Sequence, residues 1–133
     1  IEENARIDTG ATSTSISTTL AKKIGFEETL QKFDKLDLTT DLSGDKNQSE
    51  EEQNESRSKI FRTKFGDQMP DVKGVSVISS SHGISIRPLV ELEYVMDGQK
   101  IKAKVNITDR ENMNYKVLIG RKDLKGKFLV DVE

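Results

Sequence analysis

Several residue types are rare or missing from this chain of 133 residues, and each absence excludes a class of protein. Without cysteine, no disulfide framework can form. No apolar run approaches the roughly 20 residues that a membrane-spanning helix needs. The formal net charge is only −2, and no basic stripe with interleaved aromatic residues is present. We therefore expect neither a membrane span nor a nucleic-acid partner.

The compartment is left open by the same composition. A cytoplasmic chain rarely forms disulfides, and an exported chain can do without them. The chain begins at Ile1 rather than at a methionine, so we expect a trimmed or processed product that has lost an N-terminal segment.

Charge is spread unevenly along what we expect to be a single domain over residues 1–133. Residues 34–58 include eight acidic and three basic residues, a local net charge of −5, which leaves +3 for the rest of the chain. The few leucines in this segment bury too little surface to offset the entropy lost on ordering. We expect a polar acidic excursion here that is mobile or only partly paired, with residues 35–40 as a candidate edge strand.

The stretch A-R-I-D-T-G-A-T-S near the N-terminus places an acid on a tight turn. An apolar approach ends at Asp8, and Thr9 and Gly10 follow. Because glycine lets another backbone come close, the pattern is typical of a carboxylate presented in a fixed pose. It is equally typical of an ordinary turn, since a three-residue match often arises by chance.

A short helix is indicated after this turn. Ser17 can cap a helix over residues 18–24, in which Leu20 and Ile24 lie four residues apart and Gly25 is the stop. Residues 27–33 either form a second helical turn or a loop.

From Lys59 onward, runs of β-branched and aromatic residues predict strands. The Asp97-Gly98 pair predicts a tight hairpin with positive φ, and residues 79–83 predict the turn of a second hairpin. The predicted strands cover residues 60–65, 72–78, 84–96, 99–108, 117–119 and 127–132, and a short helix covers residues 121–124. This order predicts a closed or nearly closed antiparallel β fold.

Two motifs far apart in the chain carry a family resemblance. They are D-T-G-A at residues 8–11 and V-L-I-G-R-K-D-L at residues 117–124, and together they resemble a retropepsin-type aspartic protease subunit. The segments S-S-S-H-G, R-P-L-V and K-F-L-V-D resemble more closely a bacterial retropepsin-like family often labelled putative ATP-dependent zinc proteases. The resemblance implies an all-β, closed-barrel subunit with a short C-terminal helix and one active site per homodimer.

That family label names zinc and ATP, and the residues support neither. His82 is the only histidine, no H-E-x-x-H is present and no cysteine completes a site, whereas catalytic zinc ordinarily takes three protein ligands. No nucleotide-binding signature is present either. We therefore expect no metal and no cofactor, which leaves the chemistry of paired carboxylates.

One chain supplies one Asp8, whereas aspartic proteolysis needs two carboxylates that share a proton. The resemblance implies a symmetric homodimer in which Asp8 faces its copy. The ionised carboxylate would take a proton from a water that attacks the peptide carbonyl. The protonated one would polarise that carbonyl.

The resemblance also implies roles for the neighbours of Asp8. Thr9 would hydrogen-bond across the two-fold axis, although it also fits an ordinary strand-end threonine. Gly10 would offer its backbone to the substrate, and Ala11 and Thr12 would line the cleft.

Many retropepsins carry an acid where Thr12 stands here, and that acid pairs with the arginine after the late glycine. Arg121 therefore needs another partner, either Asp123 or Asp109. The late motif itself is expected to be structural, through Leu118, Ile119, Gly120 and Arg121.

Residues 79–83 resemble the tip of the flap hairpin, which closes over the substrate. The implied substrate contacts are Ser79, Ser80, Ser81, His82 and Gly83. His82 is either an exposed turn residue or a substrate contact whose charge changes near neutral pH.

Apolar positions on both sides of the flap are predicted to form the core. With the late motif, the predicted core residues are Ile7, Ile16, Leu20, Val90, Leu92, Val105, Ile107, Leu118 and Ile119.

Two functions of different classes fit this sequence. The first is a homodimeric aspartic endopeptidase that cleaves a peptide or unfolded protein bound by strand addition. The alternative is a catalytically inactive dimer of the same fold that binds a peptide or protein, because a fold does not fix a function.

Overall fold

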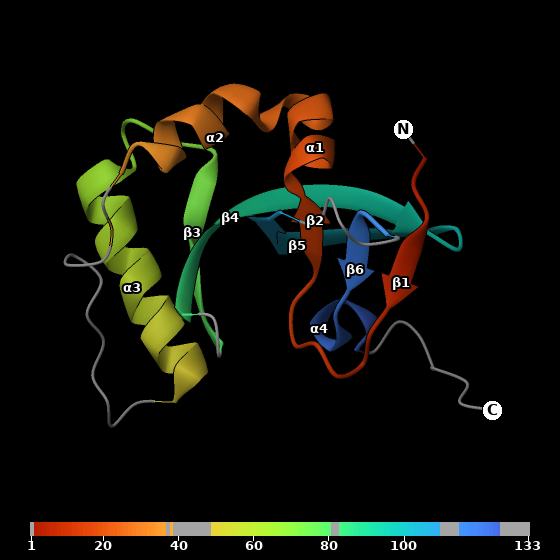
Figure 1. Ribbon diagram of the computed structural model, residues 1–133. Coiled ribbons are helices and arrows are strands. Elements are labelled where there is room, and N and C mark those ends of the chain that lie inside the picture. The colour runs from red at the N-terminus through yellow and green to blue at the C-terminus, as the bar shows by residue number, and fades with distance from the viewer. Residues whose placement is uncertain (1, 37, 39–48, 81–82, 110–114, 126–133) are drawn as a thin grey trace.

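We describe a computed structural model of the chain, which covers residues 2–36, 38, 49–80, 83–109 and 115–125. The strands in chain order are β1 (Ala5–Ile7), β2 (Ser15–Ser17), β3 (Val72–Ser80), β4 (Gly83–Met96), β5 (Gln99–Thr108) and β6 (Val117–Ile119). They form one six-stranded sheet in the order β1-β6-β2-β5-β4-β3 (Figure 1).

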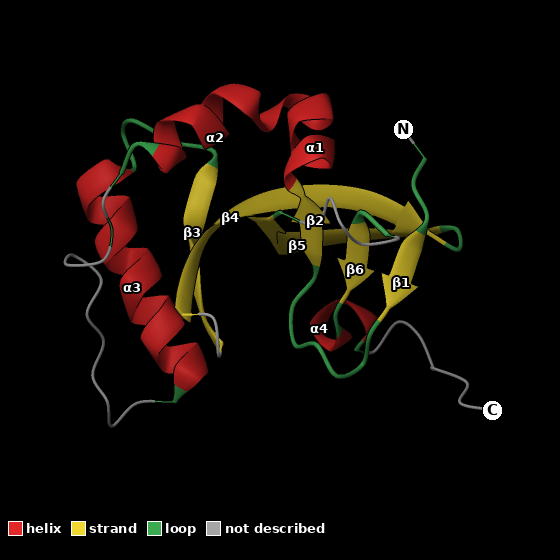
Figure 2. Cartoon of the chain, viewed as in Figure 1, coloured by secondary structure: helices red, strands yellow, loops and turns green. Residues whose placement is uncertain are grey.

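The helical segments lie around this sheet (Figure 2). They are α1 (Thr18–Ala21), the kinked segment η1 (Lys22–Phe26), α2 (Glu27–Asp34), α3 (Glu50–Phe65) and α4 (Arg121–Leu124). Figure 2 shows α3 along the outer side of β3, and α4 below β6 and β1. Among the described residues, none of these helices has the length and apolar content required to pass through a bilayer.

Both predicted hairpins are present. Asp97 and Gly98 have φ values of 50° and 77°, so the β4–β5 turn has the positive φ that its sequence predicted. In the other hairpin, Ser80 of β3 pairs with Gly83 of β4. The tip between them lies outside the described residues, and so does the predicted closing strand over residues 127–132.

The late strand β6 lies between two strands from the start of the chain. It runs parallel to β1, with Ile7 opposite Ile119, and antiparallel to β2, with Ser15 opposite Leu118. β2 in turn pairs with β5 in parallel. The two motifs that are about 110 residues apart in the sequence are therefore neighbours in the sheet.

The early helix forms as predicted and then kinks. The Ser17 hydroxyl accepts the Leu20 N–H at 3.0 Å and caps α1. Gly25, the predicted stop, has a φ of 112°, which only glycine adopts without strain. The chain then re-enters a helix at α2, so of the two possibilities for residues 27–33 the helical one is found.

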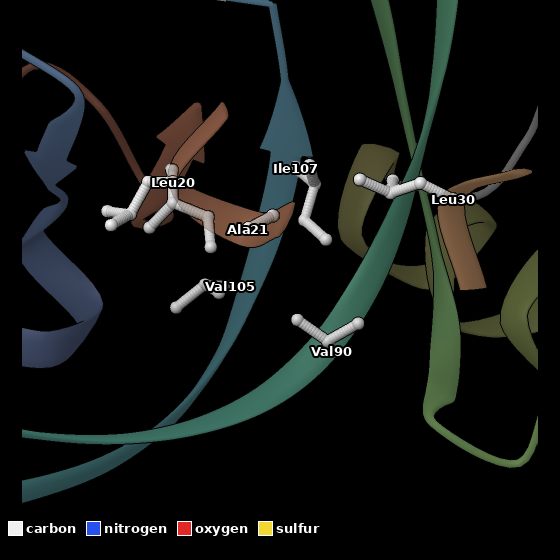
Figure 3. Close-up of a cluster of buried hydrophobic side chains, with 7 residues drawn as sticks. Leu20, Ala21, Leu30, Val90, Val105 and Ile107 are labelled. Atoms are coloured by element: carbon white, nitrogen blue, oxygen red, sulfur yellow. The ribbon is translucent and has the colours of Figure 1, made fainter. Parts of the chain in front are cut away.

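The main core packs α1 and α2 against the middle of the sheet. Figure 3 shows Leu20 and Ala21 of α1 facing Val105 of β5, with Val90 of β4 nearby. Most of the predicted core residues are buried. Ile7 is an error, because 49% of it is exposed: it lies on β1, which among the described strands is an edge strand that pairs only with β6. Leu92 is partly buried and packs against the cluster.

The predicted strand over residues 60–65 is wrong, as is the excursion where it covers residues 50–58. Both belong to α3, whose first turn is capped by the Ser49 hydroxyl, which accepts the Glu52 N–H at 3.2 Å. The fully buried Phe61 packs against Phe65, four residues on, with ring centroids 5.3 Å apart. An i, i+4 aromatic pair needs a helical turn, and a strand would separate these rings.

The closed barrel is also wrong, since the described strands form an open sheet. β1 and β3 are its two edges, and α3 lies along the outer side of β3. A barrel closes only when its edge strands pair with each other, which α3 prevents at β3. The fold is mostly β with a substantial helical part rather than all-β.

Candidate active site

The carboxylate of Asp8 is held by its own turn. The Asp8 N–H donates to the Ile119 carbonyl at 3.0 Å and so extends the pairing of β1 with β6 by one residue. The Ala11 N–H returns to the Asp8 carbonyl at 3.1 Å. On the side chain, Oδ1 accepts the Gly10 N–H at 3.0 Å, which is an Asx turn. Backbone groups thus fix the position of a half-buried acid.

Gly10 keeps space around this acid. A Cβ at residue 10 would lie 3.1 Å from Asp8 Oδ1, which is a tight contact. Glycine therefore suits a turn in which the backbone closes on a side-chain oxygen.

The late motif packs directly against the loop after Asp8. A Cβ on Gly120 would lie 2.4 Å from the Ser13 carbonyl carbon and 2.8 Å from its nitrogen, so only glycine allows the two backbones to approach this closely. The Arg121 N–H donates to the Ala11 carbonyl at 2.9 Å, and the Lys122 N–H donates to the Thr12 carbonyl at 3.1 Å. The first N–H groups of α4, which no helical carbonyl can satisfy, are thus bonded to the loop that follows Asp8.

Arg121 does not make the predicted ion pair with Asp123 or Asp109. Its Nη1 lies 3.4 Å from the carbonyl oxygens of both Thr9 and Gly10. A planar guanidinium can donate to two carbonyls at once, so Arg121 braces the backbone on the far side of Asp8. A partner made of backbone oxygens leaves no trace in the sequence.

A buried polar cluster that the sequence analysis missed lies behind this loop. The Thr14 hydroxyl, on a residue only 1% exposed, accepts the Gly120 N–H at 3.0 Å and donates to Asp123 Oδ2 at 2.6 Å. The Tyr94 hydroxyl donates to the same oxygen at 2.5 Å. Burial is the largest cause that raises the pKa of Tyr94 well above its usual range, and the hydrogen bond to Asp123 is the next. Tyr94 and Asp123 lie far apart in the sequence, and of the three residues only Asp123, in the late motif, was named from the sequence, with a different partner.

The other residues expected at the site are placed only in part. Thr9, Gly10 and Thr12 are exposed on the turn, and Ala11 is half-buried. Ser79, Ser80 and Gly83 lie at the end of the β3–β4 hairpin, and Ser81 and His82 lie outside the described residues. Whether these residues contact a substrate stays a prediction.

Two hollows open on the surface, and Asp8 lines neither of them. One of about 350 Å³ is bordered by Ser13, Lys122 and Asp123. The other, of about 890 Å³, is bordered by Thr14, Tyr94 and Ala5 of β1.

The donor set does not fit zinc. In the part of the chain that the structure describes, no three histidine, aspartate or glutamate side chains are grouped as a metal site requires. The one histidine of the chain is His82, and there is no cysteine. No chemical step is therefore assigned to a metal here.

The Thr14 hydroxyl is expected to hold the two motifs together. Replacing Thr14 with valine keeps the shape but removes both bonds, which leaves the Gly120 N–H and the Asp123 carboxylate short of a partner. We expect T14V to lower the free energy of unfolding by about 1–3 kcal/mol in urea denaturation. T14S, which retains the hydroxyl, is the matched control. Equal stability of T14V and T14S would show that these bonds contribute nothing.

The raised pKa of Tyr94 predicts a loss of stability in alkali. Above the ordinary tyrosine pKa of 10, the phenol ionises in the unfolded chain and stays protonated in the folded one. The contribution of the Tyr94 hydroxyl to the free energy of unfolding is therefore complete below pH 10 and is lost as the pH rises from there. In denaturation curves at increasing pH, Y94F should lose less stability than Y115F, which removes the only other tyrosine. Parallel curves for the two variants would contradict the Tyr94 assignment.

Comparison with known proteins identifies the family. The RimB-like family model, described as retropepsin-like aspartic endopeptidase RimB, matches residues 1–133. The comparisons with curated proteins and with solved structures each returned no match. The retropepsin-like family predicted from D-T-G-A and the late motif is thus confirmed. The chain belongs to the RimB-like family of retropepsin-like aspartic endopeptidases.

Proposed function

We propose that this chain is an aspartic endopeptidase that works as a homodimer, with Asp8 of each copy in one shared site. The observation that carries the proposal is the fixed pose of Asp8, which is held by the Gly10 N–H on one side and by the Ile119 carbonyl on the other. The family supports peptide-bond hydrolysis as the reaction. A rigidly held acid suits catalysis, because the reacting groups need not be ordered at each turnover.

Three features of the single chain support pairing through this turn. Asp8 is half-buried, and Thr9 and Gly10 beside it are exposed. Ile7, on β1 at the edge of the described sheet, exposes 49% of a large apolar side chain directly before the acid. Among the described residues, no partner bonds the Thr9 hydroxyl, which is the group that would reach across a two-fold axis. A symmetric interface here would cover all three features at once.

Pairing would also create the acid–base chemistry. Two carboxylates about 3 Å apart cannot both ionise, so they share one proton, as is general for aspartic proteases. The ionised Asp8 removes a proton from a water, whose oxygen bonds to the peptide carbonyl carbon. The protonated Asp8 of the second copy stabilises the carbonyl oxygen. A proton then passes to the leaving nitrogen as the C–N bond breaks, and no covalent intermediate with the enzyme forms.

The substrate class follows from the same arrangement. A site on a two-fold axis between two sheets accepts an extended chain, so we propose a peptide or an unfolded protein segment, bound by strand addition. An inactive dimer would bind the same ligands without cutting them, and turnover separates the two functions.

Replacing Asp8 with asparagine is expected to abolish cleavage of a diverse peptide library and to leave the fold intact. D97N is the matched control, because Asp97 lies in the β4–β5 turn and its positive φ suits asparagine. Cleavage by the unchanged protein should be blocked by a statine-type transition-state mimic and should survive a metal chelator. Cleavage by D8N at the rate of D97N would reject Asp8 as the catalytic acid. Peptide binding without cleavage by the unchanged protein would favour the binding module.

A further inference from the structure

The outer edge of β3 is closed by side chains of α3. Among the strands that the structure describes, β3 is the last of the sheet and pairs with β4 on one side only. Along its other side runs α3 (Figure 1). An open strand edge offers its backbone N–H and C=O groups to any other strand, so what covers this edge decides what the edge can bind.

Ser58 sits at the centre of this contact and replaces a pairing strand at Val75. Its hydroxyl accepts the Val75 N–H at 3.0 Å and donates to the Val75 carbonyl at 3.1 Å. One side chain thus satisfies both backbone groups of a single residue, as the opposite residue does in a hydrogen-bonded antiparallel pair. Ser58 is only 6% exposed, so water does not compete freely for these bonds.

Residues one helical turn on either side of Ser58 extend the pattern. The Val77 N–H donates to Asn54 Oδ1 at 3.1 Å. At the other end, Arg62 Nη1 donates to the Lys73 carbonyl at 2.9 Å. Together with Ser58, these residues are at positions i, i+4 and i+8 of α3.

The spacing explains how a helix can pair with a strand. Four helical residues rise about 6 Å, and two strand residues rise about 6.6 Å. Every fourth residue of α3 therefore lies beside every second residue of β3, and this holds for the three positions 54, 58 and 62. These residues are polar, which makes the docked face of the helix partly hydrogen-bonding rather than purely apolar.

Gly74 gives the helix the room it needs. A Cβ at residue 74 would lie 2.4 Å from Ser58 Oγ and 2.7 Å from Ser58 Cβ. Any other residue there would push α3 off the edge of the strand.

The bonded groups are those that a second β3 strand would use. If two copies pair antiparallel about Val75, each Val75 exchanges two bonds with its copy, and the Val77 N–H of one copy donates to the Lys73 carbonyl of the other. α3 satisfies these same four groups. In this register Lys73 lies opposite Val77 rather than opposite another lysine, so like charges do not meet. The strand V-K-G-V-S-V-I also has the β-branched, weakly charged composition that favours self-pairing.

We propose that Asn54, Ser58 and Arg62 make α3 a strand mimic that closes β3 to pairing with the β3 of a second copy. This self-association surface is separate from the Asp8 turn, and its test does not depend on the proposed activity.

The test is the variant N54A/S58A/R62A, with E55A/K59A/T63A as its matched control. The control residues share the i, i+4, i+8 spacing on α3 and are exposed. Light scattering at increasing protein concentration should show the first variant doubling its mass or more relative to the unchanged protein, with no such change in the control. Hydrogen exchange at the Val75 and Val77 amides should be faster than in the unchanged protein at low concentration, and should slow again as the variant associates.

Two results would overturn the proposal. One is a triple variant whose Val75 and Val77 amides exchange as slowly as in the unchanged protein at low concentration. The other is a variant whose amides are released but whose mass stays that of the unchanged protein at every concentration.

If the triple variant fails to fold, N54A keeps the proposal testable. It removes the acceptor of the Val77 N–H, which also accepts Arg57 Nη1 at 3.4 Å, and retains Ser58. Exchange should rise roughly fivefold at Val77 and stay unchanged at Val75, since one hydrogen bond is worth about 1 kcal/mol. Unchanged exchange at Val77 would show that the side chains of α3 do not close the edge.

Discussion

The site depends on one close approach, that of Gly120 to the backbone of Ser13. Because no side chain separates them, β6 fits between β1 and β2, and the N–H groups at the start of α4 reach the carbonyls of Ala11 and Thr12. The Asp8 turn is then held from both ends, by the pairing of β1 with β6 and by the pairing of β2 with β6 and β5. Arg121 and the Thr14 cluster add side-chain bonds to a contact that the backbones already define.

The two edges of the sheet differ in what covers them. At β3, a helix of the same chain supplies the hydrogen bonds that another strand would otherwise provide. At β1, by contrast, Ile7 is half-exposed and the adjacent turn carries the acid. This contrast fits the proposal that one edge is closed within the chain while the other pairs with a second copy.

The sequence predicted those parts of the fold whose cause is local. The β4–β5 turn follows from Asp97-Gly98, and the break after α1 follows from Gly25. The helix α3 was missed because three of its docking positions, 54, 58 and 62, are polar, so no apolar stripe with helical period was visible. Its start was nevertheless readable in Ser49 and Glu52, which have the spacing of a capping box.

Of the site, the sequence indicated the acid, its glycine and the late motif, because these occur as contiguous patterns. The partners of Arg121 are backbone carbonyls, and the hydrogen bonds of Thr14 join it to residues that are distant in the chain. Such contacts arise only when the fold brings the segments together. The roles of the flap residues and the pairing of two copies depend on partners that the sequence of one chain does not contain.

The most direct test of the central claim mixes unchanged chains with chains that carry D8N and lets the subunits exchange. If each site takes one acid from each of two copies, the activity per unchanged chain should fall in proportion to the fraction of unchanged chains and approach zero in excess D8N. An activity per unchanged chain that does not change with the mixing ratio would mean that each chain works alone, and would contradict the shared site.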